Sequence, residues 1–192
     1  TQLTQVTPIS DVYAERTTDG FNNDGMAIYV DSYDPTNNSN YYRYEYEETY
    51  KIVAPYWVPN DFVILSYTPP FRYTFEQKTT EQLTCYNTSY SNEIIQKETN
   101  DLAEDRVTKF RVRFIPQTDP IISHRYSILV KQYVQSLEAH TYYKTLDKFA
   151  GSTNVFSQTQ PGFIYGNIIS VDDNNEKVIG IFEVSSVSSK RI

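Results

Sequence analysis

Two carboxylates on one predicted strand come nearest to a catalytic arrangement. Glu45 and Glu47 alternate with large side chains in residues 40–52, so they share a strand face and leave the backbone about 7 Å apart. That separation suits the paired carboxylates of glycoside hydrolysis. Arg43 and Lys51 belong to the same face, however, and neighbouring opposite charges favour a solvated ion-pair ladder. We therefore predict no catalytic residue, and a glycan hydrolase that uses Glu45 and Glu47 stays an alternative.

Other catalytic and metal-binding patterns are missing from the sequence. His124 and His140 lack a ligand spacing such as H-E-x-x-H, and Cys85 lacks the signature of a thiol nucleophile. No serine stands in a G-x-S-x-G setting, and the six glycines form no phosphate-binding loop. Residues 19–25 and 172–176 are rich in oxygen ligands, but they fit plain turns better than the twelve-residue calcium loop. The sequence predicts no cofactor and no metal site.

The surplus of aromatic residues points to binding surfaces instead. The chain has 18 Tyr, 10 Phe and one Trp, and such rings serve both sheets and wet recognition surfaces. Tyr41, Tyr56 and Trp57 are candidates for a platform on which a sugar or a peptide stacks, although packing is the commoner role of any single ring. Asn37 and Asn38 lie in a polar loop that also matches a glycosylation sequon. These five residues are the predicted binding set.

Charge and composition exclude several partner classes. The net charge of −7 and the pI near 4.8 argue against nucleic acid and anionic lipid headgroups, since phosphate binding needs clustered basic residues. A single cysteine rules out an intrachain disulfide and leaves the redox compartment open. No stretch reaches the length of a transmembrane helix. Because the chain begins without Met or a leader, we expect either a removed targeting segment or a piece of a longer protein.

The elements that must position these residues are mostly strands. Residues 40–52 alternate large, mostly aromatic side chains with charged ones, and residues 26–33 alternate as well. A seven-residue loop joins the two runs, which predicts an antiparallel hairpin whose rings lie over Ile28 and Val30. Further strands are predicted over residues 62–67, 108–114, 125–134, 163–171 and 178–184, with a turn at residues 161–162 before the last two, which form a closing hairpin.

Three cations project from one face of the strand predicted at residues 108–114. Lys109, Arg111 and Arg113 alternate with the apolar side chains of that strand. We expect them to lie opposite the carboxylates of residues 40–52, where cross-strand ion pairs contribute a few tenths to about 1 kcal/mol.

One helix is clearly indicated. Apolar side chains recur at helical spacing over residues 137–150, Ser136 is a suitable N-cap, and Gly151 is a suitable stop. The other periodic segments have the period of strands. The fold class is therefore mainly β, an antiparallel β-sandwich-like domain with this one helix.

Three stretches together resemble a known family. The first leads from Asp24-Gly25 to the Tyr-Arg-Tyr-Glu pattern of residues 41–50, with Tyr44 and Tyr50 where the family usually has tryptophan. The others are residues 125–133 with the helix that follows, and a closing segment that comprises Gln160-Pro161, Gly166-Asn167-Ile168 and residues 180–192. This combination, which covers most of residues 20–192, resembles domain of unknown function 4249. That family comprises outer-membrane lipoproteins of Bacteroidota-type bacteria, often encoded beside TonB-dependent transporters.

The resemblance implies an architecture and a location. Full-length members of the family begin with a lipidated cysteine and an immunoglobulin-like domain. Residues 1–19 would then be a linker or edge strand from a missing N-terminal domain, and residues 20–192 a single mainly-β C-terminal domain. The protein would be associated with the outer membrane of the cell envelope, and only a lipid anchor outside this chain would reach the membrane. The family has no established catalytic residues, so none is transferred.

The expected function follows from the resemblance and the composition together. We expect a non-catalytic lipoprotein module that is an accessory or lid of a TonB-dependent outer-membrane transporter and presents Tyr- and Asn-rich loops. Its partner would be that transporter or another envelope protein, with a peptide or glycan as a further possible ligand. The alternatives are the glycan hydrolase described above and a structural component of an envelope or adhesin assembly.

Overall fold

The computed structural model describes residues 3–151, 164, 166–173 and 175–192. The strands are β1 (Ile9–Thr18), β2 (Asp24–Asp34), β3 (Tyr41–Val53), β4 (Asn60–Ser66), β5 (Arg72–Gln77), β6 (Thr84–Tyr90), β7 (Ile95–Glu98), β8 (Asp105–Pro116), β9 (Tyr126–Val134) and β10 (Ser186–Arg191). A 3-10 turn, η1 (Pro120–Ile122), precedes β9, and the α-helix α1 (Leu137–Gly151) follows it. The fold is mainly β with antiparallel sheets, and α1 is the one α-helix of the part that is described, as predicted.

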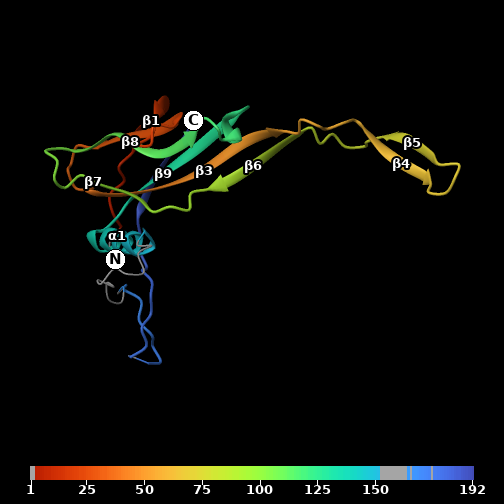
Figure 1. Cartoon of the computed structure of the whole chain (residues 1–192). Helices are drawn as coiled ribbons and strands as arrows, with labels where there is room; N and C mark the ends of the chain where they lie inside the picture. Colours follow the sequence, from red (N-terminus) through yellow and green to blue (C-terminus); the bar gives the residue numbers. More distant parts are fainter. Residues whose placement is uncertain (1–2, 152–163, 165, 174) are drawn as a thin grey trace.

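Two antiparallel sheets share one hydrophobic core, and a third, small sheet stands apart from them (Figure 1). One sheet has the order β1-β2-β8, and the other has the order β10-β9-β3-β6, with β7 also paired to β3. Val30 and Val107 of the first sheet pack in the same cluster as Tyr44 and Val130 of the second. The body is therefore sandwich-like, and its core lies between the two sheets.

β3 is the central strand of its sheet. It pairs with β9 along one edge and with β6 and β7 along the other. Tyr42, Tyr44 and Tyr46 are buried, and the residues between them are partly exposed on the outer face, as the alternation predicts. Near the end of the strand Ile52 is 44% exposed, because β3 runs beyond the core towards the third sheet.

The predicted hairpin of residues 26–33 and 40–52 is wrong. β2 pairs with β1 and β8, so both of its edges are occupied, and the loop after Asp34 crosses to the other sheet. The tyrosines of β3 still pack in one cluster with Ile28 and Val30, but they do so from the opposite sheet. Alternation identifies which face of a strand is buried, and it does not say which sheet the strand joins.

The predicted cross-strand pairing of the β8 cations with the charged face of residues 40–52 is wrong, because β8 belongs to the other sheet. The register of β8 on β2 shifts twice, and Lys109 has a φ of 49°, so the simple alternation is interrupted. Arg113 ion-pairs with Glu48 of β3 at 3.2 Å. Lys109 ion-pairs with Glu15 of β1, and the Arg111 guanidinium lies 5.6 Å from the Phe114 ring.

Buried carboxylates join the two sheets. Asp105 of β8 accepts hydrogen bonds from the hydroxyl of Tyr42, which lies on β3 in the other sheet, and from the hydroxyl of Thr99. It also accepts a hydrogen bond from the N–H of Ser39. Burial, with a smaller contribution from Asp105, raises the pKa of Tyr42 far above its ordinary value. Tyr42 therefore stays protonated, and its hydroxyl donates to Asp105.

The helix begins as predicted, whereas the closing hairpin does not form. Oγ of Ser136 accepts a hydrogen bond from the N–H of Ala139 at 3.2 Å, which is the N-cap bond. Residues 164, 166–171 and 178–184 form no strand. The side-chain amide of Asn167 instead bonds to both peptide groups of Phe182, at 2.7 Å each. The predicted turn at residues 161–162 and the first predicted strand residue, Phe163, lie outside the described residues.

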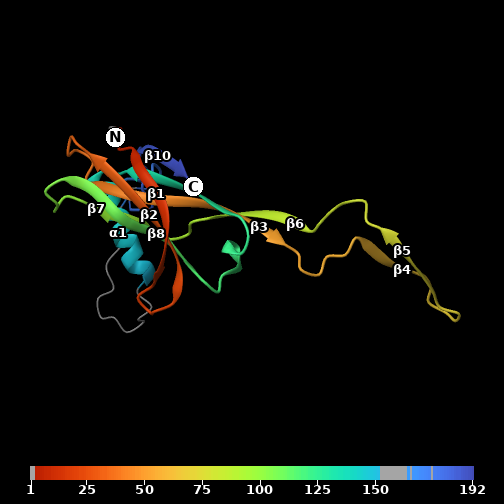
Figure 2. The same cartoon turned by 90° about the horizontal axis from the view of Figure 1, so that it is seen from above.

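The third sheet forms the end of a long projection (Figure 2). β4 and β5 pair only with each other among the described strands, and the two views agree that they lie far from the body. We name residues 54–83 the arm. It leaves the body where β3 ends and returns where β6 begins, and the N–H of Ala54 donates to the carbonyl of Leu83 at 2.9 Å across its base.

Candidate functional site

The predicted binding residues lie at opposite ends of β3. Asn37 and Asn38 belong to the loop that leads into the strand, and Tyr41 is its first residue. Tyr56 and Trp57 follow its other end, at the base of the arm. The 13 residues of β3, at about 3.3 Å each, separate the two groups by roughly 40 Å. The five residues therefore belong to two regions and do not form one platform.

Asp34 organises the loop that carries Asn37 and Asn38. Its carboxylate accepts hydrogen bonds from the N–H of Thr36 at 2.9 Å and from the N–H of Asn38 at 3.1 Å. Asn37 has a φ of 56°, in the left-handed region that asparagine tolerates better than most residues. Both asparagines are exposed on this fixed turn.

Tyr41 is part of the contact between the sheet and α1. Its ring centroid lies 4.9 Å from that of His140, a residue of the helix. The ring therefore helps to pack the helix, which reduces the surface it can offer to a ligand.

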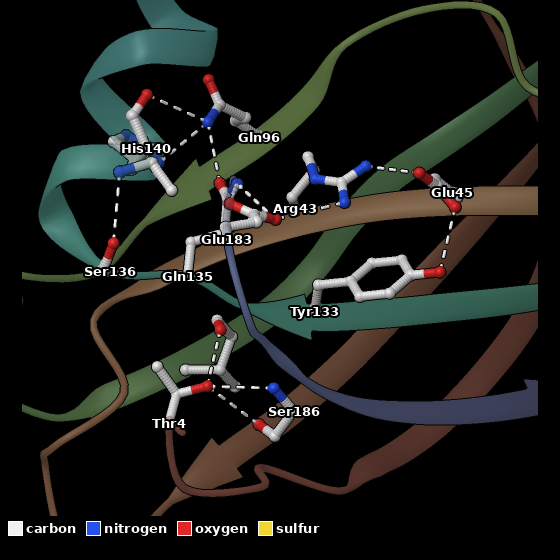
Figure 3. Close-up of polar contacts among 12 residues, drawn as sticks. Thr4, Arg43, Glu45, Gln96, Tyr133, Gln135, Ser136, His140, Glu183 and Ser186 are labelled. Carbon is white, nitrogen blue, oxygen red and sulfur yellow. Dashed lines mark hydrogen bonds and ion pairs between the residues drawn. The ribbon is translucent and has the colours of Figure 1, made fainter. Parts of the chain in front are cut away.

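His140 lies within a polar network that joins α1 and β7 to Gln135, the residue after β9 (Figure 3). Nε2 of Gln96 donates to Oε1 of Gln135 at 2.9 Å and lies 3.1 Å from Nδ1 of His140. An amide nitrogen only donates, so Nδ1 accepts and the neutral ring carries its proton on Nε2, which lies 3.3 Å from Oε2 of Glu98. Burial lowers the pKa of His140, against the opposing effect of Glu98. The hydrogen bond from Lys144 is the main cause that lowers the pKa of Glu98.

The two carboxylates with hydrolase-like spacing are both paired with arginine. Glu45 ion-pairs with Arg43 and accepts a hydrogen bond from the hydroxyl of Tyr133 at 3.0 Å. Glu47 ion-pairs with Arg191 of β10 at 3.2 Å. This face of the sheet is the ion-pair ladder that the sequence favours, but its arginines come from β3 and β10 and not from β8.

The guanidinium of Arg43 lies between Glu45 and Glu183 (Figure 3) and lines a cleft on this outer face. The rings of Tyr133 and Tyr143 stack against it, with centroids 4.6 and 5.0 Å away. Glu183 reaches it from the closing segment, 3.4 Å from Nη2, and also accepts a hydrogen bond from Nε2 of Gln135 at 3.1 Å. We name this cleft of about 490 Å³, which residues 181–185 also line, the Arg43 recess.

An aromatic face covers one side of the arm. In the register of β4 and β5, Phe62 lies opposite Phe75 and Ile64 lies opposite Tyr73, so the four side chains share one face. The rings of Phe62, Tyr73 and Phe75 lie 5.2 to 6.0 Å apart. All four residues are between 42% and 64% exposed. We name these four residues the aromatic face of the arm.

The two predicted aromatic residues of the arm differ in their surroundings. Tyr56 is 92% exposed, so its ring is available to a partner. Trp57 is partly buried, with Nζ of Lys78 5.7 Å from its ring centroid and the same Nζ 3.4 Å from Asp61. Trp57 therefore packs within the arm, against Lys78. The aromatic face itself was not predicted, although the alternation of Tyr73 and Phe75 with polar residues over residues 72–77 is a signal for it on β5.

These regions offer surfaces for binding. In the part of the chain that the structure describes, no three His, Cys, Asp or Glu side chains are grouped so that they could hold a metal ion. Within the same part, no helix is both long and apolar enough to cross a bilayer.

The fold and these surfaces define a class of protein, a mainly-β module with a sandwich-like body and a projecting aromatic arm. The family model described as domain of unknown function (DUF4249) matches residues 1–191, and the chain belongs to that family. The match confirms the family resemblance and extends it over residues 1–19. No curated protein and no solved structure matches the chain.

Proposed function

We propose that the chain is a non-catalytic binding module of a lipid-anchored cell-envelope protein. In this proposal the module is an accessory of a TonB-dependent outer-membrane transporter, and the arm is the part that docks on that partner. The observation that carries the proposal is the exposed aromatic surface of the arm. It lies far from the body, so it contributes nothing to the packing of the body.

The aromatic residues of the arm together expose a large area. Six aromatic residues of the arm are between 57% and 92% exposed, namely Tyr56, Phe62, Tyr67, Phe71, Tyr73 and Phe75. An aromatic side chain carries about 150–250 Å² of surface, so together they expose on the order of 800 Å². One partner contributes about 800 Å² to a standard interface, so the six residues together expose an area comparable to one side of an interface.

The construction of the arm also favours a partner. A two-stranded sheet alone is marginally stable in water, and no described strand pairs with the outer edge of β4 or of β5. A docked protein would cover the aromatic face and supply the missing packing layer.

The charges of the arm favour a protein over an anionic bilayer. Asp61 lies opposite Glu76 on the face that faces away from the aromatic residues, and the whole chain has a net charge of −7. Attraction to anionic headgroups depends on clustered Lys and Arg. The arginine pairs of Glu45 and Glu47 likewise support a binding function over glycan hydrolysis, because a nucleophile or general acid must be available to the substrate.

The test is purification of the native lipoprotein from detergent-solubilised outer membranes. The arm variant replaces Phe62, Tyr73 and Phe75 with serine. The control makes the same change at Phe21, Tyr86 and Tyr90, which lie outside the arm and are between 60% and 90% exposed. We expect a transporter to co-purify with the wild type and with the control, and to be lost from the arm variant. A wild-type preparation without any transporter contradicts the proposed function. Retention by the arm variant contradicts the role of the arm.

A further inference from the structure

Arg43 presents an incompletely satisfied edge. Nε and Nη2 of an arginine form one side of the guanidinium, which binds a carboxylate through two parallel hydrogen bonds. Arg113 uses this side on Glu48, with bonds of 3.2 Å from Nε and 3.3 Å from Nη2. In Arg43, Glu183 lies 3.4 Å from Nη2, whereas Nε is buried and no group of the described residues accepts its hydrogen bond. One half of a carboxylate site is therefore left unused.

The recess holds that edge in place. Tyr133 and Tyr143 stack on the guanidinium, and Glu45 binds Nη1 at the other side of the group. The Arg43 side chain is only 16% exposed, so its position is fixed by packing as well as by charge. A buried N–H without an acceptor is destabilising, and a ligand oxygen at Nε would remove that cost.

Glu183 comes from a segment outside the sheet. Residues 178–184 form no strand, and both peptide groups of Phe182 bond to the side chain of Asn167. The Glu183 carboxylate ties this segment to Arg43 and Gln135. A carboxylate on such a segment can leave the recess without breaking a strand pairing at residues 178–184.

We propose that the Arg43 recess is a binding site for the carboxylate of a small organic acid or of a peptide C-terminus, and that Glu183 occupies it from within the chain. The incoming carboxylate takes the Nε–Nη2 edge of Arg43 in the two-bond geometry and accepts a hydrogen bond from Gln135. The rings of Tyr133 and Tyr143 contact the apolar part of the ligand. The cleft of about 490 Å³ is within the usual range for small-ligand sites, about 300–1,000 Å³.

Competition with Glu183 gives the proposal a measurable consequence. A tethered group competes with a free ligand at an effective concentration on the order of millimolar. The Glu183→Gln substitution removes the internal carboxylate, so we expect it to strengthen binding of an added carboxylate at least tenfold. Glu176→Gln, at an exposed position just before that segment, makes the same change in net charge away from the recess and serves as the control.

The probes are benzoate and N-acetylphenylalanine, each compared with its neutral amide by NMR titration of the full chain. We expect an acid to shift the resonances of Tyr133 and Tyr143 in the wild type, with at least tenfold tighter binding to E183Q and unchanged binding to E176Q. Binding of benzoate assigns the site to free acids, and binding of N-acetylphenylalanine alone assigns it to a chain terminus.

Three results would overturn the inference. They are the absence of any acid-induced shift in both the wild type and E183Q, equal binding of an acid and its amide, and equal affinities of E183Q and E176Q. Should E183Q not fold, the wild-type titration still decides through the comparison of acid with amide. A second variant, Arg43→Lys, keeps the charge and lacks the two-bond edge, so it should bind the acids at least tenfold more weakly than the wild type.

Discussion

At the scale of single residues, Glu48 links more strands than any other side chain discussed above. It is 6% exposed, and its carboxylate binds Arg113 of β8, the hydroxyl of Tyr126 on β9 at 2.8 Å, and the hydroxyl of Ser89 on β6 at 3.1 Å. Glu48 itself lies on β3, so four strands from both large sheets meet at one carboxylate. The sequence places Glu48 on the aromatic face of β3, and only the partner strands explain why a carboxylate is stable there.

Glu48→Gln should lower the free energy of unfolding by about 2 kcal/mol, because it removes the charge that the partly buried Arg113 requires. Chemical denaturation measures the change. Glu104→Gln is the control, because Glu104 pairs with Arg106 at 3.1 Å in an exposed position. This substitution should change the free energy of unfolding by no more than about 0.5 kcal/mol. Equal effects of the two substitutions would contradict the role assigned to Glu48.

His140 gives the stability of the fold a pH dependence of known sign. Burial lowers its folded-state pKa below the ordinary value of 6.5, so the unfolded chain binds the proton more readily. The contribution of neutral His140 is fully present above pH 6.5 and is lost as the pH falls below that value. The loss has a limiting slope of about 1.4 kcal/mol per pH unit.

Chemical denaturation of the wild type and of His140→Gln between about pH 7.5 and about pH 5 isolates this effect. Both limits lie roughly one pH unit or more from the ordinary pKa of histidine. The stability of the wild type should fall more steeply than that of the variant below pH 6.5. Glu98 does not interfere, because its folded-state pKa is lowered from 4.5 and its contribution is lost only at lower pH. Parallel curves would refute the assignment.

At the scale of elements, the arm is an addition to a body that is complete without it. The hydrophobic core contains no residue of the arm, and the bond between Ala54 and Leu83 closes its base. Replacing residues 55–82 with Asn-Gly joins β3 to β6 by a tight turn. The free energy of unfolding of the truncated chain should be within about 1 kcal/mol of the wild-type value, while the co-purifying partner is lost. Failure of the truncated chain to fold would mean that the arm belongs to the core structure.

The elements that could be predicted are those whose own sequence determines them. Alternation places β2, β3 and β9, and helical spacing with a cap and a stop places α1, because these signals are local. β5 and β6 were not predicted, because β5 is only six residues long and closely follows the Pro69-Pro70 break, and because β6 is mostly polar. The closing hairpin was predicted from the turn residues 172–176 between two strand-like runs, but in the described residues side-chain bonds from Asn167 to Phe182 take the place of strand pairing.

At the scale of the whole molecule, strand pairing and the recess could not be predicted from the sequence. The hairpin prediction failed because β1 and β8 occupy both edges of β2. The Arg43 recess combines residues from β3, β9, α1 and the closing segment, and no local pattern brings Arg43 and Glu183 together across 140 positions. Of the predicted binding residues, Tyr56 lies on the exposed arm, whereas Tyr41 and Trp57 contribute to packing.

The continuity of β3 has a mechanical consequence. The same strand that carries Tyr42, Tyr44 and Tyr46 in the core leads directly into the arm. A force applied to the tip of the arm is therefore transmitted along β3 into the middle of the sheet, where its hydrogen bonds to β9 share the load at once. The small sheet at the end of the arm is held, among the described strands, only by the pairing of β4 with β5. Under tension the small sheet should therefore open first. The body should keep its fold while the arm detaches from the bound partner.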